Sequence, residues 1–319
     1  MGIRGLSAFL RWRTPTARKG IDWTKHTDER WGIDCSCLMY RARAEGLSLP
    51  TVVSSLVVRM RRYNIQPIVI FDGRPPASKS DVTDKRREDR ALVRQSMATL
   101  ATELSATGLT SSERVDKEGQ VAALQAKTPI VNRGDRDELK RFLYAAGVLF
   151  VTATGEADDL LAYLARERHI SAVVSTDMDM LARGVPLLIV PDTADATVMT
   201  EIALTSVLAA LRLTQSQFLD ACLLMGSDYA PVRWRRYEPA VAVEAARKGL
   251  WDISGGALIV AAAAPAAGLL RGDGVTLDTL LSEPQRAKWE AGVPAREPET
   301  MAAMAAEAGW PLDWLELLA

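Results

Sequence analysis

The stretch Pro67-Ile68-Val69-Ile70-Phe71-Asp72 is a short, almost entirely apolar run that ends in an acid. Its β-branched residues favour an extended backbone, and a run without polar alternation is typical of a strand that is buried on both faces. Similar runs recur along the chain, bounded by polar or turn-forming residues. They predict strands at Trp31–Ile33, Pro67–Phe71, Val148–Val151, Ser171–Ser175 and Pro186–Val190.

Helical patterns lie between these runs, at Ser54–Arg62, Asp135–Ala146 and Glu156–Arg166. Strands that alternate with helices indicate an α/β fold with a mainly parallel central sheet, flanked by helices on both faces. An insertion at about 75–133 is too long for an ordinary loop, and its composition favours helix. We expect a main domain over 1–250 and a small helical C-terminal region of unknown role over 251–319.

Acidic residues follow the predicted strands. Asp34 and Asp72 come directly after the first two, and further acids follow the third strand, the fourth strand and the apolar stretch 218–225. The carboxyl ends of parallel strands share one sheet edge, so these side chains should converge there. Such crowded carboxylates repel one another unless cations hold them. The candidate ligands are Asp34, Asp72, Glu156, Asp158, Asp177, Asp179 and Asp228.

Oxygen ligands in a chain with only two histidines point to Mg²⁺, with Mn²⁺ as a substitute, and not to zinc. Two such ions roughly 4 Å apart suit phosphodiester displacement. A lone Asp177-Met178-Asp179 motif is more often a solvated turn, but recurrence after successive strands favours a metal site. One choice stays open on spacing alone, because Glu156 faces Asp159 better than Asp158 on a regular helix.

The bulk composition restricts the remaining classes. A net charge of −1, from 39 basic and 40 acidic residues, argues against a generic nucleic-acid binder, although basic residues cluster locally. Three cysteines without a C-x-x-C pair argue against a disulfide scaffold. We expect an intracellular, reducing compartment, either nucleus or cytoplasm, with a virus-encoded origin left open. The longest apolar run, Ala257–Leu270, is too short to span a membrane.

Six motifs in order over about residues 1–230 resemble the flap endonuclease family of structure-specific 5′ nucleases. They are MGIRGL (1–6), GIDCS (32–36), FDGRPP (71–76), GEAD (155–158), STDMD (175–179) and GSDY (226–229). The resemblance implies magnesium-dependent hydrolysis of branched or flapped double-stranded DNA by two metal ions. It also implies flap endonuclease and 5′–3′ exonuclease activities that serve DNA replication or repair.

The resemblance assigns roles by position. It implies that the seven carboxylates above form the metal cluster, with Asp158 in place of Asp159, and that the insertion is a helical arch for a single-stranded flap. Lys79 and Arg86 match basic residues that contact the scissile phosphate, and a spacing of seven puts them on one helix face. By themselves they would be taken as part of a solvated helix. The resemblance implies DNA-binding roles for Gly2 and Tyr40, and the local basic clusters add Arg59, Arg233, Arg235 and Arg236 as DNA-binding candidates.

The chain departs from the family after GSDY. The run APVRWRRYEPA (230–240) lacks the expected glycines, which argues against a K⁺ site built from backbone carbonyls. Arg233, Arg235 and Arg236 either grip phosphate directly or are solvated, and both interpretations stay open. No sliding-clamp motif is found. The alternative functions are a 5′–3′ exonuclease or gap nuclease of the same superfamily and a catalytically silent protein that binds branched DNA.

Overall fold

A computed structural model describes residues 3–74, 80–105, 109–191, 198–226, 237–249, 268, 270–272 and 274–308. The chain forms two compact units. Unit 1 comprises Met1–Cys35, Arg59–Arg74 and Val148–Pro294, and unit 2 comprises Ser36–Val58, Pro75–Gly147 and Ala295–Ala319. Each unit is described by itself.

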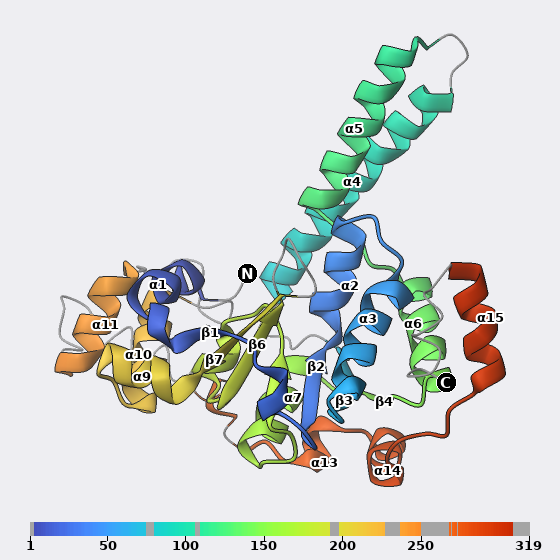
Figure 1. Ribbon diagram of the computed structural model, residues 1–319. Coiled ribbons are helices and arrows are strands. Elements are labelled where there is room, and N and C mark those ends of the chain that lie inside the picture. Colours follow the sequence, from blue (N-terminus) through green and yellow to red (C-terminus); the bar gives the residue numbers. More distant parts are fainter. Residues whose placement is uncertain are drawn as a thin grey trace. The chain divides into compact units, whose positions relative to one another are not determined.

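Unit 1 contains a seven-stranded sheet with the order β1-β7-β6-β5-β2-β3-β4 (Figure 1). The five strands β6, β5, β2, β3 and β4 are parallel to one another. At one side of the sheet, β7 pairs antiparallel with both β6 and β1. The predicted α/β fold with a mainly parallel sheet is confirmed, and each predicted strand is present to within one residue at either end. The bounds are β1 Arg18–Gly20, β2 Arg30–Asp34, β3 Gln66–Phe71, β4 Leu149–Thr152, β5 Ala172–Val174, β6 Leu187–Pro191 and β7 Met199–Ala203.

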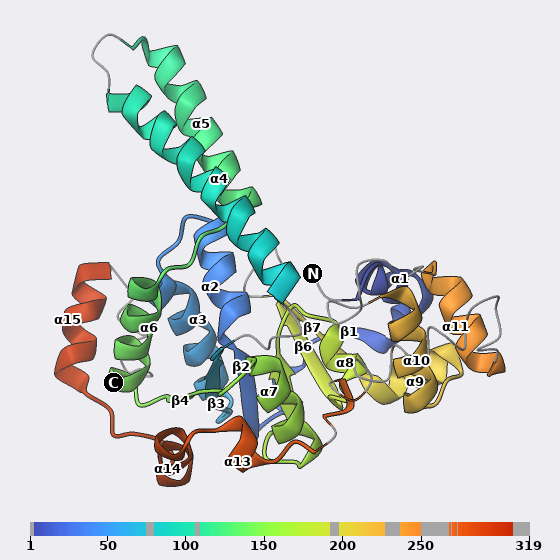
Figure 2. The same cartoon turned by 180° about the vertical axis from the view of Figure 1, so that it is seen from behind.

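Helix α7 (Ala157–Arg166) packs on the centre of this sheet, against β2, β3 and β5 (Figure 2). Gly32 in β2 permits the close approach, because a Cβ there would lie 2.6 Å from side-chain atoms of both Leu161 and Ile170. The other helical segments of unit 1 are α1 Leu6–Arg13, η1 Pro15–Ala17, η2 Trp23–Lys25, α8 Asp179–Ala182, α9 Leu204–Leu211, α10 Gln215–Met225, α11 Pro239–Lys248, α13 Leu277–Leu280 and α14 Glu283–Ala291.

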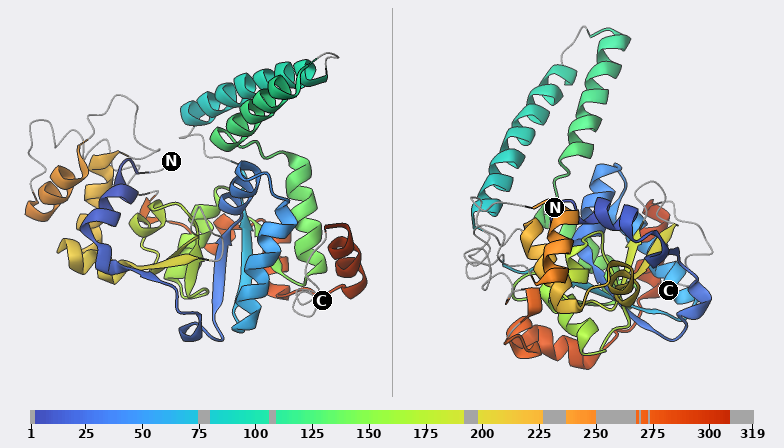
Figure 3. Two further views of the ribbon diagram at one scale, coloured as in Figure 1. Left: turned by 45° about the horizontal axis from the view of Figure 1, so that its top comes forward. Right: turned by 90° about the vertical axis from the view of Figure 1, so that its left-hand side faces the viewer.

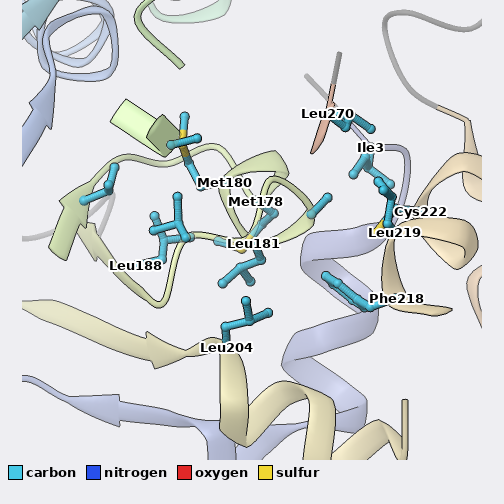
Figure 4. Close-up of a cluster of buried hydrophobic side chains, with 14 of the residues drawn as sticks. Ile3, Met178, Met180, Leu181, Leu188, Leu204, Phe218, Leu219, Cys222 and Leu270 are labelled. Atoms are coloured by element: carbon cyan, nitrogen blue, oxygen red, sulfur yellow. The ribbon is translucent and has the colours of Figure 1, made fainter. Parts of the chain in front are cut away.

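A single apolar core joins these helices to the sheet. In the close-up, Met178 and Met180 lie on either side of Asp179 in the chain and contribute to a cluster with Leu181, Phe218 and Ile3 (Figure 4). Met180, Leu181 and Phe218 are fully buried. This packing fixes the start of α8, where two of the candidate carboxylates lie.

Unit 2 is helical. Helices α4 (Ser80–Ser105) and α5 (Ser111–Lys127) pack against each other as a long hairpin, which confirms the helical character predicted for the insertion (Figure 1). Helix α5 begins with a capping box between Thr110 and Glu113. The remaining helices are α2 Cys35–Ala44, α3 Leu49–Arg62, of which residues 59–62 belong to unit 1, α6 Arg133–Ala145 and α15 Pro298–Ala308.

The C-terminal region is helical where the structure describes it, as expected. Helix α14 packs against β4 in unit 1, and α15 packs against α6 in unit 2. The expected boundary near residue 250 stays a prediction, because residues 250–267 lie outside those described. Among the described helices, none is both long enough and apolar enough to cross a membrane.

Candidate carboxylate site at the sheet edge

The ends of β2, β3 and β4 bring the first candidate acids to one edge of the sheet. Asp34 is the last residue of β2 and pairs with Ile70, two positions before Asp72. The contact between β3 and β4 continues beyond the strands, since the Gly73 amide donates to the Gly155 carbonyl over 2.7 Å. The Ala157 amide, in the first turn of α7, donates to Oδ1 of Asp72 over 2.9 Å. The helix therefore orients this carboxylate with its N-terminal dipole.

A chain of hydrogen bonds extends the site across the edge. The Ser175 hydroxyl donates to Oδ2 of Asp34 over 2.9 Å, and the Asp177 amide donates to Ser175 Oγ over 3.1 Å. The Asp179 amide donates to Oδ1 of Asp177 over 2.9 Å, and the Ile3 amide donates to Oδ1 of Asp179 over 2.6 Å. Three acids from two separate parts of the sequence, Asp34 and the pair Asp177 and Asp179, are thus held in one network. Asp34 and Asp179 are buried within it, at 7% and 4% exposure.

The two adjacent acids in the first turn of α7 have different surroundings. Burial raises the pKa of Asp158 well above its ordinary value, and the charges of Asp34, Asp177 and Asp72 raise it further, so Asp158 lies among the candidate carboxylates. Asp159 instead forms an ion pair with Arg183. Helix spacing alone left the choice between Asp158 and Asp159 open. Their surroundings favour Asp158 as the site residue, because Asp159 pairs with Arg183.

Three contributors to the site lay outside the sequence-based prediction. Ser175 links Asp34 to Asp177, and its position just before the STDMD acids was the available signal. Arg183 is buried, at 3% exposure, and its charge lowers the pKa of Asp158. Local sequence does not indicate this role, because its ion-pair partner Asp159 lies 24 residues away in the chain. Gly73 is sterically required, because a Cβ there would lie 2.0 Å from the Ala153 carbonyl oxygen.

The donor set fits a hard divalent cation. The gathered side chains are carboxylates, and burial together with the neighbouring charges of Asp34, Asp177 and Asp72 raises the pKa of Asp158. A bound cation would relieve both the burial of charge and the mutual repulsion. His26 lies between Glu29 and Glu201, and His169 stacks on Tyr163, so each imidazole has other neighbours. Within the described part of the chain, no three acidic, His or Cys side chains have the close spacing of a preformed metal site.

For several predicted residues the structure describes no side chain. Arg86 lies on α4 in unit 2, and its side chain is not among those described. The insertion is helical, as predicted, and the roles of Lys79 and Arg86 stay predictions. The predicted positions that fall outside the described residues are Gly2, Lys79, Asp228, Arg233, Arg235 and Arg236.

The two remaining DNA-binding candidates have clear surroundings. In unit 2, Tyr40 accepts a hydrogen bond from Arg90 Nη2 over 3.1 Å, and the Arg90 guanidinium carbon lies 5.8 Å from the tyrosine ring centre. In unit 1, Arg59 lies over the ring of Trp23, which stacks on Trp31 near the amino end of β2. Arg59 is thus placed at the edge opposite Asp34, and its predicted role stays a prediction.

In an α/β fold the carboxyl edge of the parallel strands is where ligands bind, so the carboxylates gathered there make this edge the candidate catalytic site. The model of the XPG N-terminal domain matches residues 1–93, and that of the XPG I-region matches residues 147–228. The chain belongs to the XPG and flap endonuclease family of nucleases.

Similar proteins agree with this assignment. Flap endonuclease 1 of Salmo salar is 30% identical over 246 residues, and the human protein is 28% identical over the same length. Each match covers 72% of this chain and 62% of the relative, so the chain spans about three fifths of those proteins.

Solved structures share the fold. Flap endonuclease-1 from Methanococcus jannaschii superposes with a TM-score of 0.62 at 19% identity, over 94% of this chain and 95% of that one. GEN1, a Holliday junction-resolving enzyme solved with product DNA and Mg²⁺, gives a TM-score of 0.59 at 16% identity, over 96% and 73%.

Proposed function

We propose that this chain is a structure-specific 5′ nuclease of the flap type, which hydrolyses phosphodiester bonds in branched DNA and also acts as a 5′–3′ exonuclease. The observation that carries the proposal is the network from Asp34 through Ser175, Asp177 and Asp179 to Ile3, which holds acids from separate segments at one sheet edge. Family membership supports the same chemistry. A role in DNA replication or repair follows from the substrate.

The proposed cofactor is a pair of Mg²⁺ ions, for which Mn²⁺ can substitute. The ions would supply an activated water and stabilise the charge on the transferring phosphorus and the leaving oxygen. The chain's own task is to orient its carboxylates, through the Ser175 hydroxyl and the amides of Ile3 and Ala157. The residues proposed to hold the ions are Asp34, Asp72, Glu156, Asp158, Asp177, Asp179 and Asp228.

The substrate contacts are proposed on the resemblance of the motifs. Lys79 and Arg86 would act on the scissile phosphate, and Tyr40 would stack on a base near the cut. Arg90 lies over the Tyr40 ring, so a base would have to displace or share this contact. Gly2, Arg233, Arg235 and Arg236 are proposed to approach the DNA backbone.

A reducing compartment is proposed as the working environment. The chain has three cysteines, Cys35, Cys37 and Cys222, of which Cys35 and Cys222 are buried. Burial raises the pKa of the Cys222 thiol well above its ordinary value, which keeps it protonated and unreactive. This chemistry fits a chain that does not depend on disulfides.

The decisive experiment compares cleavage of 5′-flap, nicked and gapped duplexes, each labelled at one end, with Mg²⁺ and with a chelator. We expect Mg²⁺-dependent cutting of the flap near its junction, mapped to the nucleotide on a sequencing gel. Equal cutting of all three substrates would assign an exonuclease or gap nuclease instead. Tight binding without product would identify a catalytically silent DNA-binding protein.

Asp177→Ala gives the matched variant for this experiment. Its carboxylate lies in the network, so we expect cleavage to fall by at least about a hundredfold while flap binding, measured without metal, stays within a few-fold of wild type. Asp278→Ala is the control, because Asp278 is an exposed acid that pairs with Arg286 on the surface of unit 1. Full cleavage activity of Asp177→Ala would show that this carboxylate site does not carry out the cleavage.

A further inference from the structure

Helix α1 is anchored directly to the carboxylate site. The Ile3 amide donates to Asp179, and the Arg4 amide donates to the carbonyl of Gly226, over 3.2 Å. The helix then buries Leu6, Phe9 and Leu10 in the core and packs against α9 and α11 (Figure 3). Eight helical residues extend about 12 Å at 1.5 Å per residue. The residues before α1 are therefore held at the site, and its packing on α9 and α11 fixes the position of its far end.

That far end carries an exposed aromatic residue between two basic ones. Arg11, Trp12 and Arg13 are all exposed, and Trp12, at 73%, is the most exposed large hydrophobic residue in the described chain. The Arg13 guanidinium carbon lies 5.2 Å from the centre of the Trp12 ring. An indole held in water contributes little to the core, so folding alone does not account for a tryptophan at this position.

The charge around Trp12 is positive. No acid occurs in the sequence before Asp22, and no carboxylate of the described residues forms an ion pair with Arg11 or Arg13. The nearby charge of Arg11, together with burial, lowers the pKa of Arg18. Uncompensated positive charge beside an exposed indole is suited to phosphates and bases, and less suited to an apolar protein surface.

We propose that the surface formed by Arg11, Trp12 and Arg13 binds an unpaired nucleotide of the branched DNA substrate. Trp12 stacks on the base, and the two arginines contact the flanking phosphates. The proposal rests on the proposed nuclease function and specifies where one single-stranded part of the substrate is held.

The test measures binding of a 5′-flap substrate and of a nicked duplex that has no unpaired nucleotide, in the absence of divalent metal. We expect Trp12→Ala to weaken flap binding about 5- to 150-fold, the range for loss of one stacked base, and to leave binding of the nicked duplex unchanged. Trp12→Phe should retain most of the flap affinity. The double variant Arg11→Gln with Arg13→Gln should lower the slope of log Kd against log salt concentration by about 1.4, at roughly 0.7 for each phosphate contact to a single strand.

Val293→Ala is the control variant, because Val293 is another exposed apolar residue of unit 1, at 48% exposure. It should bind both substrates as the wild type does. Unchanged melting temperatures will show that the Trp12 variants fold. Wild-type flap binding by Trp12→Ala, or equal losses on both substrates, would overturn the stacking role while leaving the nuclease intact. Failure of the wild-type chain to bind or cut any branched DNA would instead overturn the nuclease proposal, and this proposal with it.

Discussion

Asp158 and Asp159 are neighbours whose side chains have opposite electrostatic surroundings. Asp158 lies among like charges, whereas Asp159 pairs with Arg183, whose side chain is only 2% exposed. The carbonyl of Arg183 accepts a hydrogen bond from Arg166 Nη1 over 2.8 Å, which holds this arginine in place. Arg183 therefore serves two purposes, since it neutralises Asp159 and also lowers the pKa of Asp158. No sequence spacing indicates such a residue.

The two acids should respond in opposite ways to the same substitution. Asp159→Asn leaves a buried arginine without its carboxylate, so we expect the free energy of unfolding to fall by about 2 kcal/mol, with cleavage retained within a few-fold. Asp158→Asn removes a charge that its neighbours repel, so stability should be unchanged or higher while cleavage is lost. Urea unfolding and flap cleavage measure both effects. If the two variants behaved alike, the separate roles of these acids would be wrong.

The parallel strands could be predicted from the sequence, but the antiparallel strands could not. The five parallel strands were predicted because each is a buried apolar run. β1 was missed, since Arg18, Lys19 and Gly20 have no strand propensity and extend only by pairing with β7, where Arg18 lies opposite Ile202. β7 was missed because its mixed residues alternate only partly in burial. The pairing of β1 with β7 depends on contacts about 180 residues apart, such as Arg18 with Ile202, which local patterns do not encode.

The junction between β3 and β4 is the element on which Asp72 depends. Gly73→Ala would place a methyl group 2.0 Å from the Ala153 carbonyl oxygen and 2.6 Å from that of Thr154. Backbone must move to accommodate it, so we expect the free energy of unfolding to fall by about 2 kcal/mol and cleavage to drop as Asp72 shifts. Gly20→Ala, where nothing lies within 4 Å of the added carbon, is the control. Denaturant unfolding of both variants tests this expectation. Equal stability of Gly73→Ala and Gly20→Ala would show that the junction relaxes around the added methyl group.

For the molecule as a whole, the sequence predicted which acids converge but not what holds them. The order of acid-terminated strands was enough to place Asp34, Asp72 and Asp177 at one edge. The contact of Ile3 with Asp179 joins residues 176 positions apart, and it exists only once the core around Phe218 has packed. A net charge of −1 also conceals the separation of an acidic edge from the basic end of α1.

The buried, crowded carboxylates should make the stability of the protein depend on pH and on divalent metal together. The pKa of Asp158 is raised in the folded chain above its unfolded value, so the ion-free protein should lose stability as the pH rises between those two values. A divalent cation binds the deprotonated carboxylates, and it should therefore stabilise the fold more at pH 8 than at pH 5. At a concentration one hundred times its Kd, Mg²⁺ should add about 2.7 kcal/mol.

Thermal unfolding with and without Mg²⁺ at the two pH values measures this effect without any substrate. Asp177→Asn is the informative variant, because it removes one ligand and keeps the shape of the side chain, so the increase caused by Mg²⁺ should largely disappear. Asp278→Asn, at an exposed surface ion pair, should keep the full increase. If Mg²⁺ stabilised the wild type and Asp177→Asn equally, the ion would bind elsewhere on the chain, and the carboxylates at the sheet edge would need another explanation.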